Sequence, residues 1–259
     1  MNGSLSFLGL GAQKSGSTWL YFMLREHPGL YLPPVKELHF WDRDRALGLD
    51  WYRAQFAPAP AGTKAGEITP AYAILSHELI AEVRREFPDI RLLYLMRNPV
   101  ERAWSGALMA VPRAEMTVEE ASDQWFIDHF NSAGSRCRGD YKSCMEAWLR
   151  QFEAGRLRWF LYDEVVADPR SVLVRCAEHL GVDPGYFRDL PEDRLNARYN
   201  EGAGVPIRPS LHAYLARLYR PQILALQDYL KRDLSAWLDA NDRAMEAAPR
   251  RWLDRFFGR

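Results

Sequence analysis

Residues 9–20 read GLGAQKSGSTWL and join a short apolar run to a segment whose apolar residues recur at helical spacing. The run SLSFLGLG, at 4–11, predicts a buried strand, and STWLYFMLREH, at 17–27, predicts a helix that ends before Pro28. Glycines, a lysine and two hydroxyl residues therefore lie between a strand and a helix. Backbone N–H groups and the positive end of the helix dipole favour an anion in such a loop.

The rest of the chain repeats this alternation of strand and helix. IRLLYLM, at 90–96, predicts a second buried strand, and Pro99 is a good first residue for the helix that follows. RLRWFLYDEV, at 156–165, predicts a third strand. Strands that alternate with helices predict a parallel sheet covered on both faces. The last long helix is expected over 211–230, with a kink or break at Pro221.

The composition is that of an ordinary globular protein. The 259 residues, 47% hydrophobic and 26% charged, suffice for one sizeable core, so we expect a single domain over 1–259. Lys and Arg number 34, as do Asp and Glu, which argues against a protein that coats nucleic acid or an anionic membrane. The N-terminal residues resemble neither a signal peptide nor a membrane anchor, so we expect a cytoplasmic protein without a transmembrane segment. Three cysteines without metal-ligand spacing argue against a zinc site or a disulfide framework.

The position of Lys14 distinguishes this loop from a Walker A sequence. That pattern needs the lysine after the final glycine and beside the helix, whereas Lys14 precedes Gly16. The arrangement that holds magnesium in P-loop kinases is therefore missing, and we expect no metal requirement. A lysine early in the loop suits the bridging oxygen of a leaving group, because its charge interacts more strongly as the bond breaks.

The KSGST sequence at 14–18 resembles the first nucleotide motif of the sulfotransferase family, a strand followed by Lys-x-Gly-[ST]-[ST] and a helix. The resemblance implies a P-loop NTPase-like, three-layer α/β fold and the donor 3′-phosphoadenosine 5′-phosphosulfate (PAPS). A glycine-rich turn with a solvated lysine is the alternative. In the resemblance, the residues around the 5′-phosphosulfate are Lys14, Ser15, Gly16, Ser17, Thr18 and Trp19.

The segment LLYLMRNPVERAWSGAL, at 92–108, resembles the second motif of the same family, a strand followed by Arg-x-Pro-x-x-Arg-x-x-Ser. The resemblance implies that Arg97 and Ser105 hold the 3′-phosphate of the donor. Arg97 ends a predicted strand, where open α/β sheets bind ligands, and an arginine offers a fixed fork to phosphate. A surface arginine and a buried helical serine are the alternative.

Two further segments bear on the nucleotide pocket. GDYKSCMEAWLRQF, at 139–152, resembles the Gly-x-Tyr helix of the family and makes Tyr141 a candidate, with a core aromatic as the alternative. The basic loop with which the family often closes over the nucleotide corresponds to 200–211. That stretch lacks a Lys-Gly-Arg sequence and offers only Arg208.

The VKELHFWD sequence, at 35–42, resembles the Lys-Glu-x-His-Phe-Phe sequence of the heparan-sulfate-type and related bacterial sulfotransferases. The resemblance implies that Glu37 is the general base, a role that typically contributes a rate factor of about 10² to 10⁴. His39 is the alternative base or an orienting group, because a histidine acts as the general base in the cytosolic steroid and phenol branch of the family. A surface glutamate in a salt bridge is the alternative for Glu37.

The sequence signals for the acceptor-binding side are less specific than those for the donor site. GEITPAY, at 66–72, follows the family pattern Glu-x-[ST]-Pro-x-Tyr, but Ile68 stands where related glycan-modifying enzymes often have lysine. This argues against a highly sulfated polysaccharide acceptor and leaves Thr69 and Tyr72 as acceptor-pocket or core residues. Residues 116–138 are expected to form an acceptor-side lid or insertion or a packed helix.

The sequence as a whole predicts a PAPS-dependent sulfotransferase that releases adenosine 3′,5′-bisphosphate (PAP). We expect a hydroxyl acceptor on a small molecule, glycan or lipid, with an amine as the second candidate, and in-line displacement assisted by Glu37 and Lys14. A P-loop-type kinase and a catalytically silent nucleotide-binding homologue are the competing interpretations. The basic and aromatic tail at 242–259 is expected to be a docked helix or a frayed end, or to contact a partner or membrane.

Overall fold

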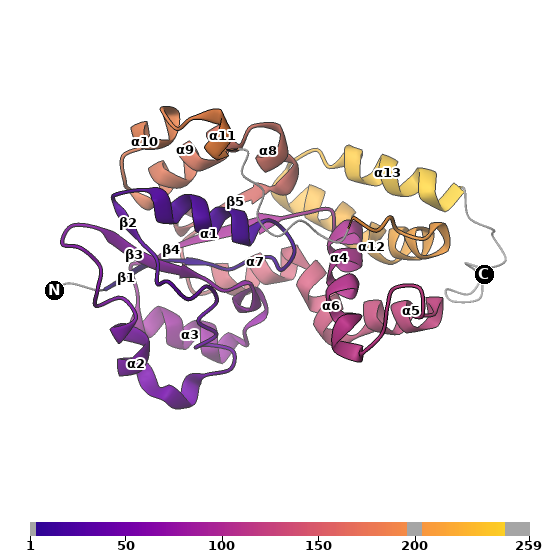
Figure 1. Ribbon diagram of the computed structural model, residues 1–259, viewed down its shortest axis with the longest axis horizontal. Coiled ribbons are helices and arrows are strands. Elements are labelled where there is room, and N and C mark those ends of the chain that lie inside the picture. Colours follow the sequence, from indigo (N-terminus) through magenta and orange to yellow (C-terminus); the bar gives the residue numbers. More distant parts are fainter. Residues whose placement is uncertain (1–3, 196–203, 247–259) are drawn as a thin grey trace. The chain divides into compact units, whose positions relative to one another are not determined.

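The computed structural model describes residues 4–195 and 204–246, which group into two compact units. Unit 1 holds the described residues up to 97 and from 144 to 195, and unit 2 holds the others (Figure 1). Most of the predicted tail and the first part of the predicted nucleotide-closing loop lie outside the described residues. The single domain that the composition predicts therefore stays a prediction.

Unit 1 is built on a five-stranded sheet in which every pair of neighbouring strands is parallel. In sheet order, the strands are β2 (Leu30–Tyr31), β3 (Lys64–Ile68), β1 (Leu5–Gly9), β4 (Arg91–Met96) and β5 (Leu157–Leu161). Strands β1, β4 and β5 confirm the three strands predicted from apolar runs, whereas β2 and β3 were not predicted. In β3, Gly66 and Glu67 interrupt the apolar pattern although both are buried.

Helices lie on both sides of this sheet (Figure 1). Helices α1 (Ser17–Glu26) and α9 (Pro169–Leu180) lie on one side, and α2 (Gly48–Ala54) and α3 (His77–Glu86) lie on the other. The remaining helices of the unit are α8 (Tyr162–Ala167), α10 (Gly185–Arg188) and α11 (Glu192–Leu195), and α7 (Tyr141–Leu149) continues into it from unit 2. This arrangement is the α/β fold, with a parallel sheet between helices, that the sequence predicts.

The largest apolar core of unit 1 lies between the sheet and the helices α1 and α9. Side chains from all five strands pack there against both helices because parallel strands covered on both faces carry almost continuous apolar runs. The fully or nearly fully buried members include Phe7, Ile68, Leu93, Leu95 and Phe160 from the strands, and Met23, Leu24, Val172, Leu173 and Cys176 from the helices.

Unit 2 is helical in its described part. Its helices are α4 (Pro99–Ala110), α5 (Asp123–Asn131), α6 (Ala133–Gly139), α12 (Pro209–Leu230) and α13 (Ser235–Glu246). Pro99 begins α4, as predicted, and the Asn98 side chain accepts a hydrogen bond from the Val100 N–H at 3.1 Å. A kink or a break was predicted at Pro221 of the last long helix: the break is wrong, because α12 continues through Pro221, and the kink stays a prediction.

A buried cation joins three helices of unit 2. The Arg102 side chain, in α4, is 1% exposed and donates to the Ser135 carbonyl oxygen of α6 at 3.0 Å. It also lies 3.5 Å from the Tyr219 hydroxyl of α12. Hydrogen bonds to neutral oxygens therefore compensate part of the cost of burying this charge.

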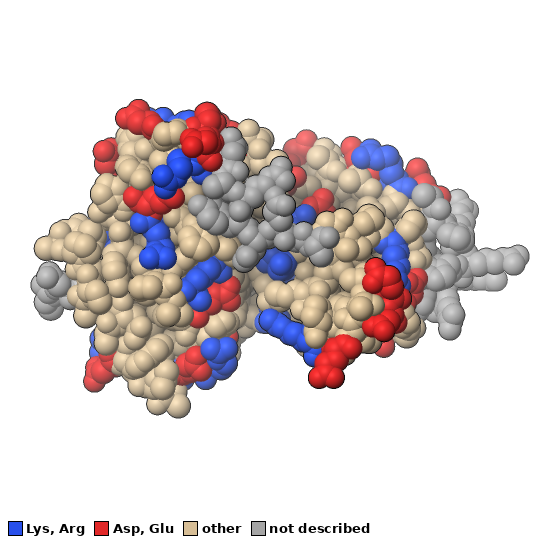
Figure 2. All heavy atoms as spheres, in the orientation of Figure 1, with Lys and Arg blue, Asp and Glu red and all other residues tan. Residues whose placement is uncertain are grey.

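The surface carries charges of both signs. On the face seen in Figure 2, Lys and Arg side chains lie scattered among Asp and Glu side chains. Within the described ranges, no helix combines the length and the apolar character that a membrane crossing requires.

The close packing of β1 against β3 leaves no room for a side chain at Gly66, which can be tested by substitution. Gly66 is the register partner of Phe7, and a Cβ atom built on it would overlap the Phe7 ring. We expect Gly66→Ala to lower the free energy of unfolding by about 1–3 kcal/mol, because overpacking forces neighbouring atoms to shift. Gly155→Ala is the control, since a Cβ there meets no atom within 4 Å, and it should change stability by less than about 0.5 kcal/mol. Urea unfolding of the two variants tests this; equal stabilities would contradict it.

Candidate active site

The loop between β1 and α1 extends the sheet before it turns. The Leu10 N–H donates to the Leu93 carbonyl at 2.8 Å, and the Ala12 N–H donates to the Leu95 carbonyl at 2.6 Å. Gly16, with φ 92°, precedes the first residue of α1, and no side chain caps this helix. The first-turn amides of a helix have no partner within it, so those of α1 are available to an anion.

Two cations follow the carboxyl ends of neighbouring strands. Lys14 lies in the loop after β1 and Arg97 directly follows β4, which pairs with β1. Burial, and secondly the Arg97 charge, lower the pKa of Lys14. A half-buried lysine beside a second cation is unfavourable alone, whereas a phosphate group beside both would remove the penalty. The residues therefore fit a ligand with more than one negative charge.

Tyr162 contacts both elements and was not predicted from the sequence. The Arg97 guanidinium carbon lies 4.9 Å from the centroid of the Tyr162 ring. A Cβ atom on Gly16 would lie 3.1 Å from the same ring, so the close approach needs a glycine there. Tyr162 is the first residue of α8 and directly follows β5, which ends at Leu161. The predicted third strand ran on to 165 and placed Tyr162 inside it, so the strand-end position that could have indicated this residue was missed.

The hydroxyl residues and Trp19 take different positions around the loop. The Ser15 hydroxyl is buried and has no hydrogen-bond partner among the described residues, so a ligand oxygen would satisfy it. Ser17 and Thr18 occupy the first turn of α1. The Trp19 side chain is in the core, where its indole N–H donates to the Leu195 carbonyl at 3.4 Å. Its contact with the donor stays a prediction.

Glu37 and His39 lie together in one loop, as predicted. The Lys36 Nζ atom is 2.5 Å from Glu37 Oε1, and His39 Nε2 is 3.2 Å from Glu37 Oε2. Sequence reasoning did not include Asp42, whose Oδ2 atom lies 2.9 Å from His39 Nδ1. Because both imidazole nitrogens face carboxylates, the ring has a fixed orientation. Glu37 is 35% exposed, so it remains accessible to an acceptor.

Three predicted nucleotide residues belong to unit 2. Ser105 is partly exposed on α4, and Tyr141 is buried at the first position of α7. Arg208 forms an ion pair with Asp123 at 2.8 Å and donates to the Val118 carbonyl at 2.6 Å. The roles of these three residues stay predictions.

Comparison with known proteins identifies the family. Residues 7–197 match the Sulfotransferase domain family. The chain is therefore a member of the sulfotransferase family. Mouse heparan sulfate glucosamine 3-O-sulfotransferase 3B1 is 30% identical over 208 residues, which cover 76% of this chain and 52% of the relative. Human heparan sulfate glucosamine 3-O-sulfotransferase 6 is 28% identical over 176 residues, covering 67% and 51%. The chain thus spans about half the length of these relatives.

Solved structures agree with the fold of this sulfotransferase family member. A sulfotransferase from Alicyclobacillus acidocaldarius superposes with a TM-score of 0.72 at 25% identity, covering 90% of this chain and 98% of that one. Mouse sulfotransferase SULT7A1 complexed with PAP gives 0.54 at 14% identity, covering 94% and 89%. At that identity the second likeness supports the fold alone.

The acceptor-pocket candidates of the GEITPAY segment are core residues. The Tyr72 and Thr69 hydroxyls are buried and donate to the Glu67 carboxylate at 2.8 and 2.6 Å. Ile68 is 1% exposed and packs against Gly9. Core packing, the second of the two interpretations of this segment, is therefore correct.

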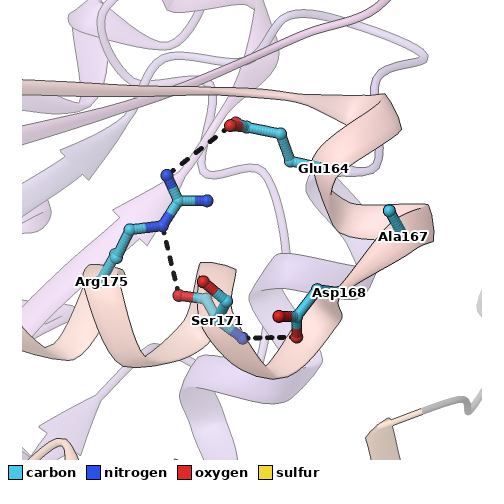
Figure 3. A pocket seen from close by; sticks show the side chains of 5 residues that line it. All are labelled: Glu164, Ala167, Asp168, Ser171 and Arg175. Atoms are coloured by element: carbon cyan, nitrogen blue, oxygen red, sulfur yellow. Dashed lines mark hydrogen bonds and ion pairs between the residues drawn. The ribbon is translucent and has the colours of Figure 1, made fainter.

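A surface pocket of this family member lies where α8 meets α9 (Figure 3). Its polar lining groups bond one another: Arg175 lies 3.7 Å from Glu164, and the Ser171 N–H donates to Asp168 at 2.9 Å. None of the sequence-predicted site residues lines it, so we assign it no function. In the part of the chain that the structure describes, no three His, Cys, Asp or Glu side chains are grouped to hold a metal ion.

The contacts of Tyr162 predict its effect on nucleotide binding. Tyr162→Ala should weaken PAP binding about twofold to thirtyfold, because it removes a cation–π contact of about 0.5–2 kcal/mol that holds Arg97. Tyr162→Phe retains the ring and should bind PAP as the parent protein does. Calorimetric titration measures both affinities; an unchanged affinity for the alanine variant would contradict this assignment.

Proposed function

We propose that this protein transfers a sulfuryl group from PAPS to an acceptor hydroxyl. The observation that carries the proposal is the pair Lys14 and Arg97, which follow the carboxyl ends of two neighbouring parallel strands in a chain of the sulfotransferase family. The donor carries negative charge at its 5′-phosphosulfate and at its 3′-phosphate, so a site with two cations suits this donor better than it suits a ligand with a single phosphate group. An amine acceptor is the second candidate.

Each donor group has residues suited to it in unit 1. The first-turn amides of α1, with Ser17, Thr18 and Lys14, suit the 5′-phosphosulfate, because amides, hydroxyls and an ammonium group all donate to its oxygens. Arg97, oriented by Tyr162, suits the 3′-phosphate. The resemblance to the family adds Ser105, Tyr141 and Arg208 as further proposed donor contacts.

Glu37 is the proposed general base. Its carboxylate accepts the acceptor proton as the acceptor oxygen bonds to sulfur, while the bond from sulfur to the phosphate oxygen breaks. Lys36 and His39 hold the carboxylate in place. Lys14 and the helix amides stabilise the negative charge that develops on the departing oxygen, so their interaction is stronger in the transition state than before it.

Two observations about the acceptor point in opposite directions. The curated relatives are named for the 3-O-sulfation of heparan sulfate glucosamine, which supports a sugar hydroxyl. Ile68, which takes the place of a lysine found in related glycan-modifying enzymes, lies in the core and adds no cation for a sulfated chain. We therefore propose a hydroxyl acceptor without assigning its chemical class.

The donor site is tested by titration with PAP beside ATP, without magnesium. We expect selective binding of PAP, and Arg97→Ala should weaken it by about tenfold or more, because a charge-assisted phosphate contact contributes about 1.5–3 kcal/mol. Arg158→Ala, which changes an exposed arginine of β5, should leave the affinity unchanged. A magnesium-dependent preference for ATP would favour a kinase and overturn the proposal.

The catalytic roles are tested by following PAP release with a panel of acceptors: p-nitrophenol, a long-chain alcohol, an N-sulfated glucosamine oligosaccharide and an alkyl amine. Lys14→Ala should lower kcat by about 10² to 10³ through loss of charge stabilisation. Glu37→Gln should lower kcat by about 10² to 10⁴ with PAP affinity retained. Lys64→Ala, at an exposed position, is the control. Full activity of a site variant would exclude the role given to that residue. PAP binding by the parent protein without turnover of any acceptor in the panel would favour a silent homologue.

A further inference from the structure

Glu67 is a buried carboxylate with four hydrogen-bond donors around it. The residue is 2% exposed. Its Oε1 atom accepts from the Tyr52 and Tyr72 hydroxyls, both at 2.8 Å. Its Oε2 atom accepts from the Thr69 hydroxyl at 2.6 Å and from the Leu38 N–H at 3.4 Å. Burial raises the pKa of Glu67, and these hydrogen bonds, led by the one from Thr69, act in the opposite direction.

This buried cluster reaches the loop that carries the proposed base. The Leu38 N–H bonds Glu67 directly, and the Trp41 N–H donates to the Tyr72 hydroxyl at 3.4 Å. The two amides belong to residues on either side of His39, and that of Leu38 directly follows Glu37. The loop backbone is therefore attached to the cluster at two points.

The loop needs such attachment because its conformation is unfavourable alone. Glu37 has φ 67° and His39 has φ 52°, in the left-handed region that side-chain-bearing residues seldom adopt. Between them Leu38 is 5% exposed, whereas the Glu37 and His39 side chains are 35% and 23% exposed. Such backbone conformations persist where surrounding contacts determine them.

We infer that Glu67 and Tyr72 are positioning residues that hold the 37–42 loop so that Glu37 and His39 face the acceptor. The inference rests on the proposed function, because it assigns Glu37 the role of base. Neither residue touches the reacting atoms in this account; each acts through the loop backbone. A carboxylate suits the position, since it accepts from all four donors, whereas a glutamine amide would turn a donor group toward other donors.

Tyr52 and Tyr72 form a matched pair for the test. Both side chains are fully buried, and both hydroxyls donate to the same Glu67 oxygen at the same distance. Among the described residues, only the Tyr72 hydroxyl also accepts a hydrogen bond from a backbone amide of the loop. Tyr72→Phe therefore removes one attachment of the loop, while Tyr52→Phe removes a donor to Glu67 and leaves that attachment intact.

We expect Tyr72→Phe to lower kcat by about tenfold to a hundredfold, because displacement of a catalytic group by about 1 Å has effects of that size. Tyr52→Phe should lower kcat by less than about threefold at a similar stability, and both variants should bind PAP as tightly as the parent. NMR spectra of isotopically labelled protein give the ring resonances of His39, which are assigned by their absence from the spectrum of His39→Gln. These resonances should shift in Tyr72→Phe and stay in place in Tyr52→Phe. This second measurement needs no acceptor.

The two proposals fail in different ways. Full activity of Glu37→Gln would overturn the proposed base. Loss of activity in Glu37→Gln, with equal kcat and equal His39 resonances in the two tyrosine variants, would overturn the positioning role alone. If Tyr72 acts through Glu37, Tyr72→Phe should change the residual kcat of Glu37→Gln by less than about twofold, because coupled residues have non-additive effects. Should Tyr72→Phe not fold, Glu67→Gln replaces it, and an unshifted His39 ring there would overturn the inference.

Discussion

The parallel pairing of β1 with β3 on one side and with β4 on the other determines where the candidate side chains of unit 1 lie. Parallel strands end at the same edge of a sheet, so residues far apart in the sequence meet there. Lys14 follows β1, Arg97 follows β4, and Glu67 is near the end of β3. Through Glu67 the loop of Glu37 is joined to the same edge. The proposed chemistry is therefore a consequence of strand order.

Glu37 and Glu67, both in unit 1, show how different environments suit identical side chains to different proposed roles. Glu37 is partly exposed beside a lysine and a histidine, which suits it to the proposed exchange of a proton with a bound molecule. Glu67 is fully enclosed, and each of its oxygens accepts hydrogen bonds from neighbouring groups. Its surroundings leave it no access to an acceptor but make it a rigid connection between β3 and the loop.

The parts of the fold that could be predicted are those with a local signal. Apolar runs bounded by glycine or arginine identified β1, β4 and β5, and the strand-end rule brought Lys14 and Arg97 together. Strand β3 had no such signal, because Gly66 and Glu67 occupy positions where a buried strand usually has apolar residues. The contact of Tyr162 with Arg97 depends on β5 lying beside β4, which local periodicity does not specify. The hydrogen bond between Glu67 and the Leu38 N–H of the loop joins segments that are distant in sequence, and no pattern within either segment indicates it.

The contact between Phe7 and Gly66 has a consequence for how this sheet changes during evolution. The ring fills the space that a side chain at position 66 would need, so the two positions share one volume. A relative that carries a side chain in place of Gly66 should carry a smaller residue in place of Phe7. We therefore expect the two sites to covary, with the aromatic ring retained only in lineages that keep the glycine.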